Sequence, residues 1–166
     1  MKPLVLIGPM GSGKSEVARI LSSSLERPLA DTDELVEKAS SRSVSQIFNE
    51  IGEPAFRDLE SRALREALSD PTAVIATGGG IVLDPLNAEL VKNKARVFYL
   101  KVTPETAALR IRNGNGRPLV EGKEVVKEIA RIIDERDATY DRAAHHVIDA
   151  EREPAAVAES IEQLLQ

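Results

Sequence analysis

The sequence predicts an α/β fold, a three-layer α/β/α sandwich built on a five-stranded parallel sheet. Short apolar runs alternate with amphipathic stretches along the whole chain, which is the pattern of a parallel sheet with helices on both faces. The length of 166 residues fits a single domain. Hydrophobic residues at 42% and charged residues at 30% are ordinary values for a globular protein. We therefore expect residues 1–166 to form one domain.

Strands are predicted at the apolar runs, and helices at the amphipathic stretches between them. The strands are expected at residues 4–7, 29–30, 73–76, 97–102 and 146–148. The helices are expected at residues 14–24, 32–39, 44–50, 53–68, 85–93, 104–112, 124–142 and 154–165. Ser43 precedes one of these helices, and Asp84 and Thr103 precede two others that begin with proline. A capping side chain before the first turn and a proline inside it are ordinary helix start signals.

Composition restricts the partners and the location of the protein. No apolar run approaches the roughly 18 residues that a membrane-spanning helix needs. A net charge of −5 argues against nucleic acids and anionic membranes, because both bind basic surfaces. The amino-terminal apolar stretch is too short for a signal peptide. We therefore expect a cytoplasmic protein that binds small molecules.

Few residues are available for a transition-metal site. The chain contains no cysteine, which excludes disulfides and thiolate ligands. Its two histidines, His145 and His146, are assigned to the last strand as structural residues. Any metal is therefore expected to be a hard cation bound by oxygen.

A phosphate-binding loop is the most specific motif in the sequence. Residues 8–15 read GPMGSGKS between the first strand and the first helix, which is the context that the P-loop pattern GxxxxGK[ST] requires. Glycines let backbone N–H groups converge on phosphate oxygens, and the helix amino terminus favours negative charge. Lys14 is expected to bridge the β and γ phosphates of ATP, and Ser15 to place its hydroxyl on Mg²⁺; the alternative is a glycine-rich turn capped by Ser15. The predicted nucleotide-binding residues of this loop are Gly8, Gly11, Ser12, Gly13, Lys14 and Ser15.

Two carboxylates follow the second strand, where a P-loop protein needs an acid near its metal. Asp31 and Asp33 are two residues apart. This spacing allows Asp31 to act on the metal and Asp33 on a substrate hydroxyl. The alternative is that Asp33 only caps the helix that follows. Asp149, after the last strand, is the lower-ranked candidate for the metal.

Three further features point to a second ligand site, and the first and the last of them also have a simpler explanation. Arg57 and Glu60 are three residues apart on a helix and can pair, as in many surface helices. Glycines 78–80 end a strand at the edge where open α/β sheets bind ligands, and such glycines usually let something approach the backbone. Residues 113–123 include three glycines, two asparagines and a proline. We expect this segment to be mobile or ordered by a ligand, either as a lid or as a surface connection.

Together these motifs resemble the shikimate kinase family, in the family's order and spacing and over nearly the whole chain. The resemblance implies the P-loop fold of the nucleoside monophosphate kinases, with a substrate-binding region at about 31–60 and a lid at about 113–123. It also implies ATP-dependent phosphorylation of the 3-hydroxyl of shikimate, a step of the chorismate pathway to aromatic amino acids. The motifs that carry it are residues 8–15, Asp31-Thr32-Asp33, Gly52-Glu53-x-x-Phe56-Arg57-x-x-Glu60, Gly78-Gly79-Gly80, Arg117-Pro118-Leu119 and Arg136-x-x-x-Tyr140.

The resemblance also assigns roles to individual residues. Asp33 is similar to the carboxylate that holds the shikimate hydroxyls and accepts the proton, and Asp31 to the residue that acts on Mg²⁺ through water. Arg57 and Arg136 resemble the pair that clamps the shikimate carboxylate, and Glu60 would orient Arg57. Bidentate guanidinium groups suit a planar anion.

Contacts to the rest of the two substrates follow from the same resemblance. Arg117 is similar to the lid arginine that reaches the transferring phosphoryl group. Arg110 and Arg152 resemble the residues that stack on adenine. The remaining implied shikimate contacts are the backbone N–H groups of Gly79 and Gly80 and the apolar side chains of Phe48, Phe56, Pro118 and Leu119.

Other functions remain open at this stage. Another P-loop kinase, such as a gluconate or nucleoside monophosphate kinase, or a non-catalytic ATP-binding relative, would share the phosphate loop. A carboxylated polyol suits the set of Asp33, Arg57, Gly79 and Arg136 better than a nucleobase does. Glu16 and Pro9 depart from the family's usual residues beside the loop, where they could change nucleotide affinity. We expect a monomer.

Overall fold

The computed structural model describes residues 1–114 and 123–166 of the chain. These residues form a single five-stranded parallel sheet with helices around it. The strand order is β2-β3-β1-β4-β5, and every pairing is parallel. The predicted α/β class and strand number are confirmed. The strands are β1 (Leu4–Ile7), β2 (Leu29–Asp31), β3 (Val74–Ala76), β4 (Arg96–Lys101) and β5 (His146–Asp149).

The helices lie where the sequence predicts them, to within a few residues. Asp31, Ser43 and Asp84 cap three of them, and Ser43 forms a full capping box with Gln46. The short 3-10 helix η1 (Ile81–Leu83), directly after three glycines, was not predicted. None of the described helices is both long and apolar enough to span a membrane. The helices are α1 (Lys14–Ser24), α2 (Thr32–Ser40), α3 (Val44–Glu50), α4 (Glu53–Ala67), α5 (Pro85–Lys94), α6 (Pro104–Gly114), α7 (Lys123–Ala143) and α8 (Pro154–Gln163).

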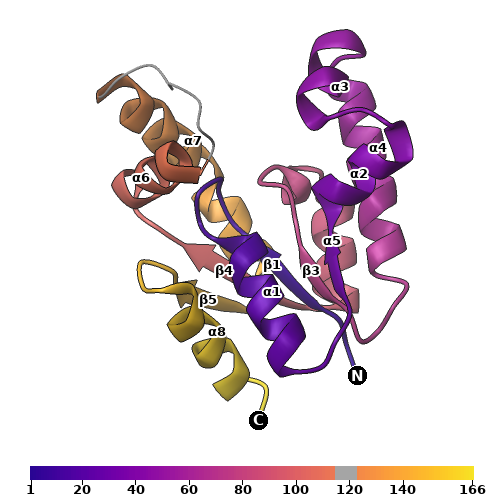
Figure 1. The fold of residues 1–166 in the computed structure, drawn as a ribbon, viewed down its shortest axis with the longest axis vertical. Coiled ribbons are helices and arrows are strands. Elements are labelled where there is room, and N and C mark those ends of the chain that lie inside the picture. Colours follow the sequence, from indigo (N-terminus) through magenta and orange to yellow (C-terminus); the bar gives the residue numbers. More distant parts are fainter. Residues whose placement is uncertain (115–122) are drawn as a thin grey trace.

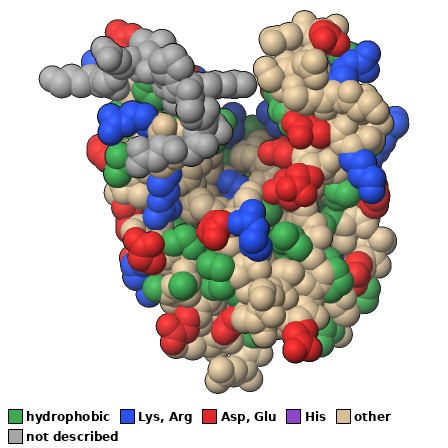
Figure 2. All heavy atoms as spheres, viewed as in Figure 1, with side chains coloured by type: hydrophobic (Ala, Val, Ile, Leu, Met, Phe, Trp, Pro, Cys, Tyr) green, Lys and Arg blue, Asp and Glu red, His purple; other side chains and the backbone are tan. Residues whose placement is uncertain are grey.

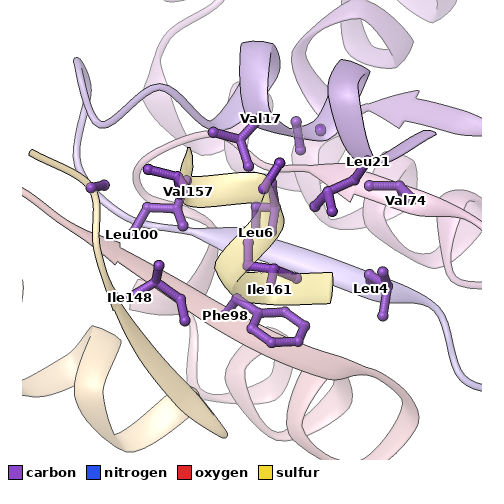
Figure 3. Packing of buried hydrophobic residues seen from close by; sticks show 14 of the residues in the cluster. Leu4, Leu6, Val17, Leu21, Val74, Phe98, Leu100, Ile148, Val157 and Ile161 are labelled. Atoms are coloured by element: carbon purple, nitrogen blue, oxygen red, sulfur yellow. The ribbon is translucent and has the colours of Figure 1, made fainter. Parts of the chain in front are cut away.

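Both faces of the sheet are covered, which explains why β1 is apolar at every position. Leu4 and Leu6 face a cluster formed with α1 and α8, whereas Val5 and Ile7 face a second cluster formed with α4, α5 and the end of α7. Alternate strand residues point to opposite faces, so a strand buried on both faces must be apolar throughout. Figure 3 shows the first cluster, in which Ile161 of α8 packs near the β-strands.

A third, smaller cluster joins α2, α3 and α4 into a lobe beside the sheet. Val36, Ile47, Phe56 and Ala63 are its buried members. In Figure 1 this lobe lies on the side of the molecule opposite α6 and the start of α7, and both termini lie at the far end from it. The carboxyl ends of β1, β2 and β3 therefore meet between two groups of helices.

Candidate active site

The phosphate loop connects the end of β1 to the first turn of α1. Three of its glycines have positive φ, at residues 8, 11 and 13. Gly11 has a φ of +81°, and a Cβ there would lie 2.5 Å from the carbonyl oxygen of Ala107 on α6. A side chain at Gly11 would therefore be strained and would also push α6 away from the loop.

Lys14 folds over this loop. Its Nζ donates hydrogen bonds to the carbonyl oxygens of Gly8 (2.9 Å) and Pro9 (2.8 Å) and to Oγ of Ser12 (3.3 Å). Burial lowers the pKa of Lys14 to about 8, although the charges of Asp33 and Asp31 oppose this shift. The buried ammonium group is thus held within the loop, where phosphate oxygens are expected to bind.

Asp31 links the loop to the second motif. Oγ of Ser15 donates to Oδ2 of Asp31 at 2.9 Å, and Oδ1 of Asp31 accepts the N–H of Asp33 at 2.9 Å. Asp31, and not Asp33, is therefore the N-cap of α2, so the capping explanation for Asp33 is wrong. Asp149 instead accepts the N–H of Glu151 in a turn after β5. A hydroxyl and a carboxylate at this distance are the oxygen ligands that Mg²⁺ prefers.

Asp33 is one of the residues that line the cleft. A Cβ placed on Gly78 would lie 3.0 Å from Oδ1 of Asp33 and 2.5 Å from Oε1 of Glu60, so both carboxylates come close to this glycine. Burial raises the pKa of Asp33 to about 6, and the charges of Asp31 and Glu60 add to the shift. A carboxylate with this pKa accepts a proton more readily than an ordinary aspartate.

Arg57 is held between two glutamates of its own helix. Its Nη1 bonds Oε2 of Glu60 at 2.8 Å, and its Nη2 bonds Oε1 of Glu53 at 3.2 Å. Glu60 is 1% exposed, and its Oε1 has no hydrogen-bond partner among the described residues. Burial raises the pKa of Glu60, while Arg57 and also Arg136 of α7 lower it. Arg57 thus bonds this buried carboxylate, and Arg136 lines the same cleft.

Sequence reasoning missed the role of Glu53 in this arrangement. The signal was present, because Glu53 lies four residues before Arg57 and such pairs interact on a helix. Phe48 and Phe56, which were predicted to surround the substrate ring, pack with ring centroids 4.5 Å apart.

Gly78, Gly79 and Gly80, which we call the glycine shelf, lie next to the phosphate loop. A Cβ on Gly79 would be 3.6 Å from both the carbonyl oxygen of Gly8 and the N atom of Met10. The N–H of Gly78 donates to Oγ1 of Thr32, which is fully buried at the start of α2. No sequence signal indicated this contact of Thr32.

These elements surround one cleft with a volume of about 770 Å³. Such a volume suits a small-molecule site. Figure 2 shows a hollow between the two lobes of the molecule, with acidic and basic side chains at its rim. Among the residues that line the cleft are Gly11, Gly13, Lys14, Ser15, Asp31, Asp33, Phe48, Phe56, Arg57, Glu60, Gly79, Gly80, Arg110 and Arg136.

The two predicted adenine contacts are placed differently. The Nη2 of Arg110 donates to the carbonyl oxygen of Ala150 (2.8 Å), and its Nη1 reaches that of Gly11 (3.5 Å), so this side chain connects the phosphate loop to the turn after β5. The Arg152 side chain instead donates to Oγ of Ser160 on α8 at 2.8 Å. The structure thus brings Arg110, but not Arg152, to the cleft.

Arg117, Pro118 and Leu119 are outside the described residues. Glu16 pairs with Arg19 on the exposed side of the first turn of α1. Its negative charge is favourable at a helix amino terminus, which gives this departure from the family pattern a structural explanation.

Comparison with known proteins supports the resemblance to the shikimate kinase family over most of the chain. The family model for shikimate kinase matches residues 10–166. A shikimate kinase of Caulobacter vibrioides is 43% identical over 146 residues, which cover 88% of this chain and 73% of that protein.

Solved structures agree with the sequence comparison. The shikimate kinase from Acinetobacter baumannii in complex with shikimate superposes with a TM-score of 0.91 at 31% identity, over 99% of this chain and 93% of that one. The deoxyadenosine kinase from M. mycoides with bound dATP has a TM-score of 0.65 at 18% identity, over 98% of each chain. This second likeness concerns the fold alone, which is that of the P-loop kinases.

Proposed function

The chain belongs to the shikimate kinase family, and we propose that the cleft described above performs the family's reaction with Asp33 as the base. The enzyme is an ATP-dependent kinase that phosphorylates a hydroxyl group of shikimate. The observation that carries the site assignment is that Arg57, Arg136 and the buried Glu60 line the same cleft as Lys14 and Asp33. This cleft offers the cations of Arg57 and Arg136 to a carboxylate and the cation of Lys14 to phosphates.

The arginine pair is proposed to hold the carboxylate of shikimate. Glu60 bonds one Nη of Arg57 at 2.8 Å and so fixes the direction of the guanidinium group before the substrate arrives. Preorganised donors lose less side-chain entropy on binding. The glycine shelf would donate N–H groups to the same substrate, and Phe48 and Phe56 would cover its apolar edge.

The phosphoryl transfer is proposed to use Asp33 and Lys14. The 3-hydroxyl oxygen of shikimate forms a bond to the γ-phosphorus, the bond to the β-γ bridging oxygen breaks, and the hydroxyl proton passes to Asp33. The raised pKa of Asp33 suits this proton transfer near neutral pH. Lys14 and the N–H groups of the phosphate loop would stabilise the charge on the γ-phosphoryl oxygens.

Ser15 and Asp31 are proposed to hold Mg²⁺. Their oxygens are 2.9 Å apart, and Mg²⁺ commonly binds through one or two protein oxygens together with substrate phosphates and water. No group of three or more metal-binding side chains occurs in the part of the chain that the structure describes, so the phosphates would have to complete the ligand set. When bound, the ion supplies positive charge next to the phosphate oxygens.

Other roles rest more on the sequence than on geometry. Arg117, Pro118 and Leu119 are proposed as contacts of the γ-phosphoryl group and the shikimate ring, from the resemblance alone. Arg110 is proposed as an adenine contact because it bridges Gly11 and the turn at residues 150–152. Arg152 keeps this role only as a prediction.

We also propose that the enzyme is a single-domain monomer of the cytoplasm, with a substrate region at about 31–60 and a lid at about 113–123. The length of 166 residues fits one domain, and the reaction consumes ATP. Light scattering at working concentration tests the monomeric state, and cell fractionation tests the cytoplasmic location.

The experiment that tests the function measures ADP release from Mg·ATP with shikimate, gluconate, nucleoside monophosphates or no acceptor. ADP release with shikimate alone is the expected result. Release with another acceptor would retain the ATP site and overturn the assigned substrate contacts. Absence of release with every acceptor would overturn the catalytic assignment.

A further inference from the structure

We propose that Tyr140 is a positioning residue for phosphoryl transfer, because its hydroxyl sets the orientation of the peptide bond between Gly79 and Gly80. Oη of Tyr140 donates a hydrogen bond of 2.5 Å to the carbonyl oxygen of Gly79, 61 residues away in the chain. This inference rests on the proposed function, in which the shelf donates N–H groups to shikimate.

Planarity of the peptide transmits the effect of this bond to the substrate side. In a trans peptide the C=O and the following N–H point in opposite directions, so Tyr140 on the carbonyl of Gly79 directs the N–H of Gly80 away from itself. Tyr140 is fully buried, whereas both glycines line the cleft. Among the described residues, neither Gly79 nor Gly80 donates its N–H to an acceptor. The hydroxyl therefore leaves the Gly80 donor free for a ligand.

This peptide needs an external partner to hold it. The peptide plane between two glycines can turn more easily than any other, because neither residue has a Cβ to restrict the backbone dihedrals on either side of it. The residues on either side of this peptide are held by other contacts. Oγ1 of Thr32 accepts the N–H of Gly78, and the 3-10 helix η1 begins at Ile81. The Tyr140 hydroxyl is the side-chain contact that the structure provides to the Gly79 carbonyl.

Tyr140 is itself rigidly placed. Its ring packs against that of Tyr99 with centroids 5.0 Å apart, and Tyr99 donates to Asp137 of α7 at 2.7 Å. Lys101 of β4 bonds the same carboxylate at 2.9 Å. Helix α7 is thus attached to β4 independently of Tyr140. The same helix carries Arg136, one turn before Tyr140, so one element places both the arginine and the shelf.

The test compares Tyr140→Phe with Tyr99→Phe. Each variant keeps a buried aromatic ring and loses one hydroxyl, but only Tyr140→Phe leaves the Gly79 carbonyl without its bond. Burial raises the pKa of the Tyr140 hydroxyl and Arg136 acts on it in the opposite direction, so the kinetic comparison needs a second readout at the amide of Gly80 itself. We expect Tyr140→Phe to lower kcat/KM for shikimate by about tenfold, with KM for ATP changed by less than about twofold. Tyr99→Phe is expected to keep both values within about twofold, because Lys101 still holds Asp137.

The possible results distinguish a failure of this inference from a failure of the proposed function. A Tyr140→Phe enzyme with unchanged shikimate kinetics would overturn the inference, while the wild-type activity with shikimate would still stand. Equal losses for shikimate and ATP, or equal losses in the two variants, would show a structural role only and would also overturn it. As a second readout, the amide resonance of Gly80 should shift on adding shikimate to the wild-type protein. That shift should weaken in Tyr140→Phe, and an identical shift in both proteins would contradict the proposal.

Discussion

Gly80 lies directly against the guanidinium group of Arg57. A Cβ at Gly80 would come within 2.7 Å of Nη2 and 2.8 Å of Cζ of Arg57, closer than real Cβ contacts. The proposed carboxylate clamp therefore depends on the absence of a side chain at Gly80, which is itself part of the shelf peptide. Arg57 cannot keep its present position beside any residue larger than glycine.

Gly80→Ala should weaken shikimate binding. The new methyl group displaces the guanidinium from Glu60, so we expect the Kd for shikimate, measured by calorimetry, to rise by about tenfold or more. Gly79→Ala is the matched variant, because its Cβ would meet only ordinary contacts at 3.6 Å. A larger effect for Gly79→Ala than for Gly80→Ala would contradict the steric argument.

Asp33→Asn should lower turnover strongly and leave nucleotide binding nearly unchanged. Loss of a general base lowers kcat by about 10²- to 10⁴-fold, while the phosphate loop is left intact. Steady-state kinetics and ATP calorimetry on the same preparation measure both quantities. Asp149→Asn serves as the control, since Asp149 bonds only a turn after β5. Near-normal turnover of Asp33→Asn would remove Asp33 from the role of base.

The raised pKa of Asp33 also predicts how stability depends on pH. In the folded protein its pKa is about 6 instead of the usual 3.8, so the folded state binds more protons between these values. The free energy of unfolding should therefore fall as pH rises from about 4 to 6, by an amount on the order of 2 kcal/mol. Urea unfolding of the ligand-free protein in metal-free buffer measures it. In Asp33→Asn this fall should be largely absent, and an equal fall in both proteins would contradict the assignment.

Arg57→Ala should affect shikimate more than ATP. The variant removes one of the two arginines proposed to bind the carboxylate of shikimate. We therefore expect the Kd for shikimate to rise by about 10- to 100-fold, with little change in the Kd for ATP. Arg131→Ala is the control, because Arg131 forms only exposed pairs with Glu128 and Glu135 on α7. Equal effects of Arg57→Ala on both ligands would return Arg57 to the role of a helix-surface ion pair.

Local patterns in the sequence were sufficient to predict the strands and the α-helices that the structure describes, but not the 3-10 helix η1. Residues 4–7 are apolar throughout because β1 is buried on both faces, and Ser43 and Asp84 cap helices because their side chains bond the first turn. The phosphate loop was predictable for the same reason, since its chemistry depends on consecutive residues at the end of one strand. These interactions span only a few residues, so sequence spacing determines them.

Contacts between residues that are far apart in the sequence could not be predicted from motif spacing, and the tertiary structure decided them. The strand order β2-β3-β1-β4-β5 places the start of α2 beside the shelf, where Thr32 bonds Gly78 across 46 residues. It also brings Tyr140 to Gly79, and it turns Arg110 to the cleft and Arg152 to α8. Such contacts depend on how helices pack on the sheet, which is a property of the whole buried core. The sequence by itself determined which chemical groups are present, and packing determined which of them meet.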